Sequence, residues 1–242
     1  MIKKSILILL CGVLGISANT DTKNYASVGT NTVKTEIAVP VYTIASDFEK
    51  AGLFYDGLTG TAGDANDING RYGPFGGNGP FITAEKAYSG KQSVKLIRGG
   101  SELSVFTAKK IPDDKDCCAE VWIYRTKNSS FVLYTRNRNA SDSAGIYVLD
   151  NGGVRLRNFK GSPAWQTTQL SIPVEKWILL RVYTLRGKGK FYAAISEDRK
   201  TETVSDIKSD INEAGETYMI RIIPQSPEGN ITYIDNISLY YK

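Results

Sequence analysis

Between residues 118 and 195 the sequence alternates apolar residues with arginine and tyrosine, and this alternation limits the folds open to the chain. Successive side chains of an extended strand point to opposite faces of a sheet. Over residues 131–138, Phe131 and Leu133 therefore face one way. The opposite side carries Tyr134, Arg136 and Arg138. The pattern predicts a strand with one face in a core and one face that combines rings with guanidinium groups.

The same alternation recurs along the chain, with turn residues between the segments. Residues 154–157 place Arg155 and Arg157 on the polar side, and a turn sequence at 150–153 joins them to a strand at 145–149. Further short strands are expected at 41–44, 93–97, 103–106, 119–124, 177–185, 191–195, 218–223 and 231–240. The sequence shows no long amphipathic helix and no internal repeat. It therefore predicts an all-β fold, an antiparallel two-sheet β-sandwich of jelly-roll type.

Residues 1–18 are typical of a signal peptide. Lys3 and Lys4 precede an apolar stretch at 6–10, and residues 16–18 offer a cleavage site. The apolar stretch is shorter than the roughly 20 residues that a membrane-spanning helix needs. Residues 19–40, rich in Thr, Ser, Asn and Lys, predict a flexible linker. Residues 41–242 are then expected to form the β-sandwich domain.

The expected location is secreted or extracytoplasmic, in the periplasm or at the cell surface. An alternative is a lipid anchor on Cys11, which would become the mature N-terminus. Bacterial lipoprotein signals usually place Gly, Ala or Ser before the acylated cysteine, whereas this chain has Leu10. Simple cleavage is therefore favoured. No other segment of the sequence is apolar enough to predict a transmembrane span.

Charge and residue usage exclude several kinds of function. The chain has 30 lysines and arginines against 25 acids, a net charge of +5. Loss of Lys3 and Lys4 with the signal lowers this charge to +3, which is too mild and too dispersed to predict a nucleic-acid partner. The sequence contains no histidine. This excludes Ser-His-Asp and Cys-His catalysis and histidine-ligated zinc.

Two cysteines, Cys117 and Cys118, are adjacent near the start of an expected strand. Neighbouring residues of a strand point to opposite faces, so a disulfide between them needs a strained turn. The favoured interpretation is a pair of small buried side chains. A vicinal disulfide and a contact between chains remain open, as does the oligomeric state.

Four short pieces resemble known sequence patterns when they are taken in order along the chain. They are residues 47–49, 89–96, 172–177 and 233–239. Together the pieces resemble carbohydrate-binding modules and the related concanavalin A-like sandwiches of secreted glycan-processing proteins. The resemblance spans most of residues 47–241, and it implies a fold more than a function.

The resemblance also implies a structural calcium ion. In many modules of this kind an early acid, backbone oxygens near the second piece and a late aspartate hold the ion. The matching positions are Glu49, residues 89–92 and Asp235, and oxygen ligands of this type suit calcium. Asn236 stands where many members carry a second acid. The alternative is that Glu49 and Asp235 only cap turns.

Strand parity predicts a face that suits a sugar ligand. Sugars stack on aromatic rings, and their carboxylates accept planar bidentate hydrogen bonds from arginine. The residues expected to share one face are Trp122, Tyr124, Tyr134, Arg136, Arg138, Tyr147, Arg155, Arg157, Arg181, Tyr183 and Tyr192. The candidate carbohydrate-binding residues are Tyr134, Arg136, Arg138, Tyr147, Arg155, Arg157 and, in a loop at 161–165, Trp165. The predicted function is binding of a polysaccharide, possibly an acidic one. The alternative is an ordinary solvated sheet face.

Two further functions stay open on the same fold. A polysaccharide lyase would use tyrosine as acid or base and arginine to neutralise a uronate, with Tyr134, Arg136 and Tyr147 as first candidates. A retaining glycoside hydrolase needs two carboxyl groups about 5 Å apart, and only Glu120 falls inside an expected central strand. No catalytic residue is assigned, so a non-enzymatic protein is favoured. A structural or protein-interaction domain at the cell surface is the remaining alternative.

Overall fold

The computed structural model describes residues 40–46, 48–49, 69–71, 80–98, 102–137, 141–212, 217–225 and 229–241. The predicted signal peptide with Cys11, nearly all of the predicted linker, and Arg138 lie outside these residues. The expectations for them remain predictions. Over the part of the chain that is described, no helix combines the length and the apolar character needed to cross a membrane.

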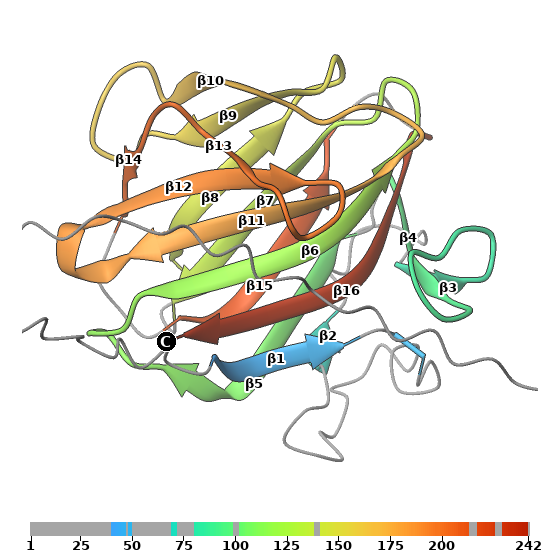
Figure 1. Cartoon of the computed structure of the whole chain (residues 1–242), viewed down its shortest axis with the longest axis horizontal. Helices are drawn as coiled ribbons and strands as arrows, with labels where there is room; N and C mark the ends of the chain where they lie inside the picture. The colour runs from blue at the N-terminus through green and yellow to red at the C-terminus, as the bar shows by residue number, and fades with distance from the viewer. Residues whose placement is uncertain are drawn as a thin grey trace, which may run out of the picture. The chain divides into compact units, whose positions relative to one another are not determined.

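Strands of the described residues form two antiparallel sheets (Figure 1). Sheet A runs in the order β13 (Thr203–Val204), β12 (Lys190–Ser196), β11 (Trp177–Leu185), β6 (Cys117–Arg125), β16 (Ile231–Tyr241), β4 (Ser93–Ile97), β3 (Phe81–Thr83), with β1 (Val41–Ser46) also paired to β16 and β14 (Ser209–Asp210) to β12. Sheet B runs in the order β10 (Trp165–Ser171), β9 (Gly153–Arg157), β8 (Asp142–Val148), β7 (Phe131–Asn137), β15 (Thr217–Pro224), β5 (Leu103–Ile111), β2 (Asn69–Arg71). A short 3-10 turn, η2 (Arg186–Lys188), follows β11. The predicted antiparallel two-sheet β-sandwich is confirmed.

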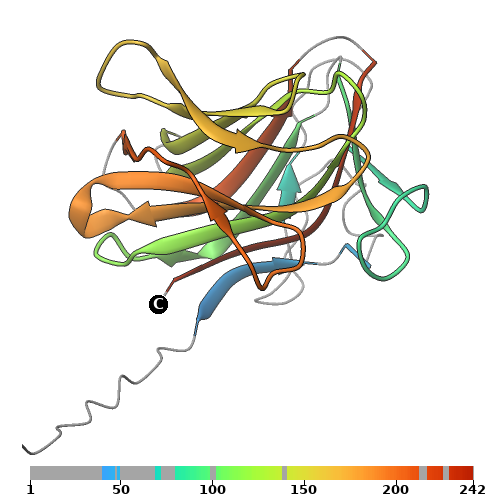
Figure 2. The same cartoon turned by 45° about the horizontal axis from the view of Figure 1, so that its top comes forward.

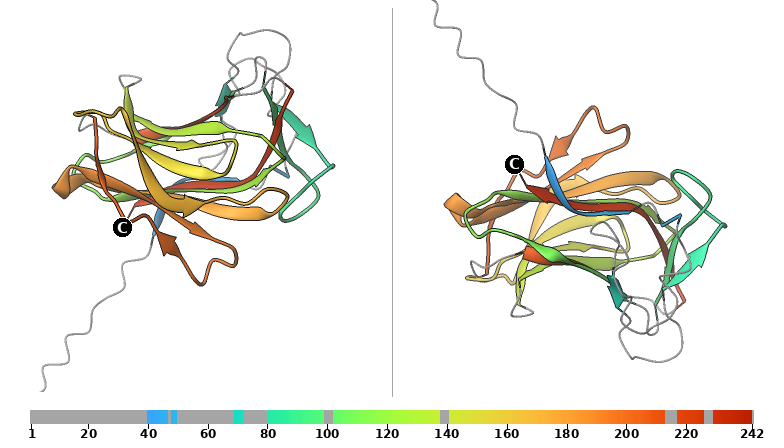
Figure 3. Two further views of the ribbon diagram at one scale, coloured as in Figure 1. Left: turned by 90° about the horizontal axis from the view of Figure 1, so that it is seen from above. Right: turned by 90° about the horizontal axis from the view of Figure 1, so that it is seen from below.

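The core lies between the two sheets, which stack one above the other in the views of Figure 3. Strand β9 shows how the alternating sequence produces this layer. Val154 and Leu156 are fully buried, whereas Arg155 and Arg157 between them are half-buried on the outward side. Burial of apolar surface contributes about 25 cal/mol for each Å². The apolar side chains of each alternating segment therefore stabilise the fold, and the side chains between them point away from the core.

A buried arginine holds one end of the sandwich together. Arg125 is 2% exposed, and its Nε donates to the Ile172 carbonyl oxygen at 2.7 Å. Its Nη1 donates to the carbonyl oxygens of Ser129 and Asp150, both at 2.9 Å. The turn between β8 and β9 closes over it, and a Cβ at Gly152 would lie 2.7 Å from Arg125 Nη2. Gly152 has a φ of +93°, so glycine suits this turn on both grounds.

One expectation of strand parity is wrong. The aromatic and basic residues expected to share one face are divided between the two sheets. Sheet A carries Trp122, Tyr124, Arg181, Tyr183 and Tyr192, and sheet B carries Tyr134, Arg136, Tyr147, Arg155 and Arg157. The outward faces of a sandwich point in opposite directions (Figure 3). Alternation identifies the outward side of a strand, but it does not say to which sheet the strand belongs.

The adjacent cysteines are both free and buried. Cys117 packs into the apolar core, whereas Cys118 is not part of that core cluster. The two side chains therefore lie on opposite sides of β6, as neighbours in a strand do.

Candidate functional site: a basic and aromatic sheet face

The outward face of sheet B gathers the candidate residues of the described chain. Figure 2 shows strands β7 to β10, coloured lime to ochre, side by side on one side of the sandwich. We call this surface the basic-aromatic face and define it by Tyr134, Arg136, Tyr147, Arg155, Arg157, Trp165 and Arg221. The structure thus brings together all the candidates except Arg138, which lies outside the described residues. Trp165 begins β10 and does not lie in a loop as expected.

Rings and guanidinium groups face each other across neighbouring strands. Tyr147 of β8 is directly opposite Arg155 of β9, and Arg157 is directly opposite Trp165 of β10. The Arg157 guanidinium carbon lies 5.1 Å from the centre of the Trp165 ring. The rings of Tyr147 and Trp165 meet edge to face, with centroids 5.5 Å apart. Trp165 is therefore held between a second ring and a cation.

Gly145 of β8 makes room for Tyr134 on this face. A Cβ at Gly145 would lie 2.8 Å from Tyr134 Cε1 and 3.1 Å from Arg157 Cβ. The Tyr134 ring therefore lies across β8 and reaches towards β9. Glycine inside a strand often marks such a close approach. A glycine inside an expected strand is visible in the sequence. Strand parity predicts only the direction of side chains, so it could not predict that Gly145 makes room for the Tyr134 ring.

Two acids lie on the basic-aromatic face, and each pairs with an arginine at its margin. Arg136 Nε lies 2.8 Å from Asp142 Oδ1. Arg221 Nη2 lies 2.5 Å from Glu102 Oε2. Arg221 was not among the candidates, although the alternation of β15 indicates that it points outward. These pairs leave Arg155 and Arg157 at the middle of the face.

Neither Arg155 nor Arg157 forms an ion pair with a carboxylate among the described residues, although the charge of Arg157 acts on Asp142. The ion pairs of this part of the chain involve neither of them, and the Nε atom of each is buried without a hydrogen-bond partner. An arginine stays charged in proteins, and a buried N–H without a partner is costly. These two side chains are therefore the groups of this face that can gain most from an added acceptor.

Two titrating groups of the face, Tyr134 and Asp142, have raised pKa values. Burial raises the pKa of Tyr134, and the nearby charge of Asp142 raises it further. The hydroxyl therefore stays protonated at neutral pH, as a hydrogen-bond donor. Burial also raises the pKa of Asp142, opposed by the charges of Arg136, Arg221 and Arg157. Three guanidinium groups thus act on the carboxyl of Asp142.

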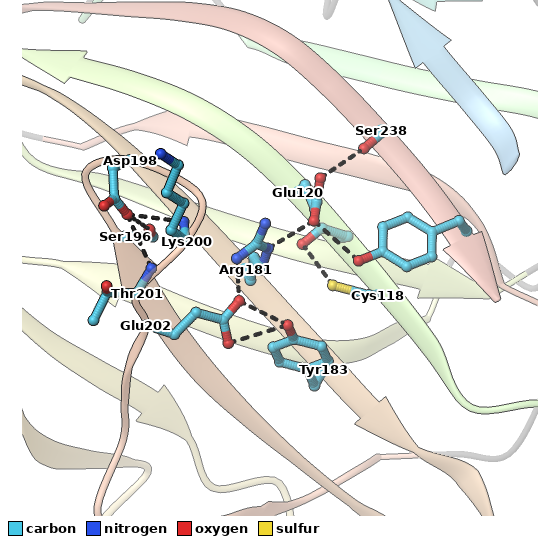
Figure 4. A network of polar contacts seen from close by, with 12 residues as sticks. Cys118, Glu120, Arg181, Tyr183, Ser196, Asp198, Lys200, Thr201, Glu202 and Ser238 are labelled. Atoms are coloured by element: carbon cyan, nitrogen blue, oxygen red, sulfur yellow. Dashed lines mark hydrogen bonds and ion pairs between the residues drawn. The ribbon is translucent and has the colours of Figure 1, made fainter. Parts of the chain in front are cut away.

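The outward face of sheet A carries similar residues in a closed arrangement (Figure 4). We call the central group the Glu120 network. Arg181 Nε donates to Glu120 Oε1 at 2.6 Å, and Arg181 Nη1 contacts Glu202. The Tyr183 hydroxyl donates to Glu202 Oε1 at 3.0 Å, and the Tyr240 hydroxyl donates to Glu120 Oε1 at 2.9 Å. Each charged group of the network therefore already has partners within the protein.

Three aromatic residues of sheet A, Trp122, Tyr183 and Tyr192, also pack against other protein groups. Trp122 is fully buried on this side, with the Tyr88 ring stacked on it at a centroid distance of 3.6 Å. The Arg199 guanidinium carbon lies 5.8 Å from the centre of the Trp122 ring. Tyr183 stacks on Tyr192 at 4.8 Å. These rings stack on other protein groups, which leaves less of their surface open to a sugar.

The two predicted calcium ligands bind backbone amides. Both Tyr88 and Ser89 donate their main-chain N–H to Asp235 Oδ2, at 2.8 and 3.1 Å. Glu49 Oε1 accepts the N–H groups of Lys91 and Gln92 at 2.8 and 2.9 Å.

These donors surround the carboxylates with N–H groups, whereas calcium needs six to eight oxygen ligands. The described residues contain no group of three acids, cysteines or histidines that could hold a metal ion. The geometry does not fit the calcium site that the resemblance implied. The carboxylates fasten residues 88–92 directly, and a structural calcium at Glu49 and Asp235 remains a prediction that this arrangement does not support.

Comparison with known proteins identifies the fold. Neither a protein-family model nor a curated protein matches the sequence. A sialidase matches the structure with a TM-score of 0.52 and 10% identity, over 81% of this chain and 18% of that chain. The botulinum neurotoxin serotype D binding domain matches with a TM-score of 0.51 and 12% identity, over 83% of this chain and 48% of that chain.

A form of the VIP36 exoplasmic/lumenal domain with Ca2+ and Man2 bound matches with a TM-score of 0.49 and 13% identity, over 73% of this chain and 80% of that chain. This chain spans less than half the length of the sialidase and neurotoxin chains. At such low identity the likeness shows the fold alone. The chain therefore has a jelly-roll β-sandwich fold of the concanavalin A-like type, as its sequence resemblance implied.

Proposed function

We propose that the protein binds an acidic polysaccharide through the basic-aromatic face. The observation that carries this proposal is the pair Arg155 and Arg157, which are flanked by rings and form no ion pair with a carboxylate among the described residues. The sugar ring would lie against Tyr147 or Trp165. Its carboxylate or sulfate would accept hydrogen bonds from the guanidinium groups, and Tyr134 would donate through its hydroxyl.

The contrast with sheet A supports this choice of face. Arg181 shares its charge with Glu120 and Glu202, so a ligand anion would have to compete with two acids already in place. On the basic-aromatic face a ligand anion replaces water and not a protein carboxylate. Binding there adds charge-assisted hydrogen bonds at low cost to the fold.

We also propose that the protein acts outside the cytoplasm, where it can reach such polysaccharides. This location follows from the predicted signal peptide at residues 1–18, with a lipid anchor at Cys11 as the alternative. Calcium has no part in the proposed contacts, because the face itself supplies the cations. We therefore expect binding to be unchanged by a chelator and to weaken with salt.

The test compares one polysaccharide in two charge states. Polygalacturonate and its methyl ester present the same sugar ring with and without a carboxylate, and calorimetry or a glycan array measures binding to each. We expect saturable binding to the acid form and at least tenfold weaker binding to the ester, since a hydrogen bond to a charged group contributes about 1.5–3 kcal/mol. Sulfated and neutral glycans on the same array define the preferred anion.

Two charge-matched variants locate the site. Arg157→Met removes one positive charge from the basic-aromatic face. Lys208→Met removes one from the side of sheet A, where Lys208 Nζ lies 5.2 Å from the centre of the Tyr192 ring. We expect the first variant to lose about tenfold in affinity and the second to bind as the unaltered protein does. Equal affinity in both variants would refute this location.

The same incubation separates the alternatives. Released unsaturated sugar would indicate the lyase, although the protonated state of Tyr134 and the pairing of Arg136 with Asp142 make a base on this face difficult to assign. Release of saturated oligosaccharides would indicate a hydrolase. Failure to bind any acidic or neutral glycan would leave the structural or protein-interaction domain as the function.

A further inference from the structure

A second unpaired cation lies inside the sandwich, away from both outward faces. Arg186 follows β11 as the first residue of η2, and it is 8% exposed. Its Nη2 donates to the hydroxyl of Thr217 on β15, so the side chain reaches from sheet A to sheet B. Cys117 of β6 and Thr184 of β11 are directly opposite each other beside it. We call these four residues the Arg186 cluster.

The guanidinium of Arg186 is incompletely satisfied. Its Nε and Nη1 atoms are buried without a hydrogen-bond partner, and so is the hydroxyl oxygen of Thr184. The ion pairs of the described residues do not include Arg186. Asp116, next to Cys117 in sequence, instead accepts the main-chain N–H of Arg186 at 2.7 Å. Unused donors of β11 and of η2, which follows it directly, therefore lie beside Cys117 in the interior.

Arg125, at the turn between β8 and β9, shows how this protein otherwise buries an arginine. Its Nε donates to the carbonyl oxygen of Ile172, and its Nη1 donates to the carbonyl oxygens of Ser129 and Asp150. Buried polar groups without partners are rare, and a specific case often marks an ion or a water. The difference between the two arginines indicates that the partner of Arg186 comes from outside the chain.

The cluster itself offers no counter-charge. Arginine keeps its proton in proteins. Burial raises the pKa of the Cys117 thiol, although Arg186 and the two threonine hydroxyls lower it, so the sulfur stays neutral. Water could accept the free N–H groups, but it would leave the charge of Arg186 uncompensated in an apolar surrounding. A group that accepts hydrogen bonds and carries one negative charge satisfies both needs.

We propose that the Arg186 cluster binds a small monovalent anion of halide type inside the sandwich. Arg186 Nε and the Thr184 hydroxyl donate to it. One guanidinium balances one negative charge, so a divalent anion such as sulfate would leave an excess charge in the interior. A halide is also small and only moderately hydrated, so its burial costs less than that of a larger or more strongly hydrated anion. This site is independent of the glycan function.

The test measures stability of the full chain against the anion present. Thermal unfolding is followed in sodium chloride, sodium bromide and sodium gluconate at equal ionic strength. An anion that binds the folded state alone raises the midpoint with the logarithm of its concentration. We expect the midpoint to rise with chloride and bromide and to stay constant with gluconate. Equal midpoints in all three salts would overturn the proposal.

Variants and a direct measurement assign the effect to the cluster. Arg186→Met keeps the length of the side chain without the charge and should abolish the dependence on chloride. Lys188→Met, an exposed residue of the same turn, should retain it. Should Arg186→Met fail to fold, Thr184→Val tests the site with a smaller change and should weaken the chloride effect. In crystals soaked with sodium bromide, an anomalous peak within hydrogen-bond distance of Arg186 Nε is expected, and ordered water there would refute the proposal.

Discussion

The outward faces of the two sheets use the same residue types in opposite ways. On sheet A, Arg181 faces Glu120 and Glu202, so the Glu120 network is closed and carries one net negative charge. On sheet B, the arginines of the basic-aromatic face exceed the two acids, Asp142 and Glu102, and leave a net charge of two positive units. The difference teaches that composition alone does not separate a structural face from a candidate binding face. What separates them is whether the hydrogen bonds of the charged groups are complete.

The tryptophans repeat the comparison. Trp122 of sheet A is fully buried beneath Tyr88, with Arg199 close by. Trp165 of sheet B is only half-buried and touches Tyr147 at an edge. A fully buried ring stacked on another ring adds to stability, whereas a half-buried ring keeps part of its surface exposed. The predictions below test whether stability and binding divide between the two faces in this way.

The same substitution on each face should give the largest difference. Arg181→Met leaves Glu120 and Glu202 without their shared cation, and we expect a loss of about 3 kcal/mol in the free energy of unfolding. Arg157→Met should change that free energy by less than about 0.5 kcal/mol, because no ion pair among the described residues includes Arg157. Urea unfolding of both variants measures the effect. Equal losses would show that the basic-aromatic face is also structural.

The sequence predicted which side chains of each strand point outward, but it could not predict to which sheet each strand belongs. Strand parity placed Tyr134, Tyr147 and Arg155 on the outward side correctly, because alternation is a property of a single strand. It could not assign strands to sheets, since that depends on pairings such as β6 with β16, whose residues are more than 100 positions apart. The result was one expected face where the structure has two.

Contacts between distant segments explain the remaining gaps. Asp235 and Glu49 were expected to hold an ion, yet they accept amide N–H groups from residues 88–92. An acid between distant segments looks the same in sequence whether a cation or a backbone loop completes its contacts. Arg221 was missed for a similar reason, since its place on the face follows from the pairing of β15 with β7.

Gly145 tests how strictly the basic-aromatic face is built. Gly145→Ala would place a methyl group against Tyr134 and Arg157, and we expect a loss of about 1–3 kcal/mol in unfolding free energy from this overpacking. Glycan affinity should fall as well, because both displaced side chains belong to the face. Gly187→Ala is the matched control, since a Cβ there meets nothing within 4 Å. A stable Gly145→Ala protein with full affinity would show that Tyr134 has no role in binding.

Removing one ring from each face should separate the two roles with a smaller effect. Tyr88→Ala removes the stacked cover of Trp122, and we expect a loss of about 1 kcal/mol in unfolding free energy with unchanged glycan affinity. Trp165→Ala should lower the affinity by about tenfold and change stability less, since that ring is only half-buried. Chemical unfolding and calorimetry on both variants measure the pair. The reverse pattern would exchange the roles assigned to the two faces.

The smallest predicted effect concerns an exposed acid at the margin of sheet A. Glu85 accepts from Lys95 Nζ at 2.8 Å and from the Tyr233 hydroxyl at 2.7 Å, and these hydrogen bonds lower its pKa. A lowered pKa in the folded state adds stability above the unfolded pKa, and this stability is lost as the pH falls through the folded value. Tyr233→Phe should therefore move the pKa of Glu85 back towards its ordinary value. Tyr134→Phe, on the other sheet, should leave it unchanged. Carbon NMR of the Glu85 carboxyl through an acid titration measures both shifts, and a response of Glu85 to Tyr134→Phe would mean that the two faces are coupled through the core.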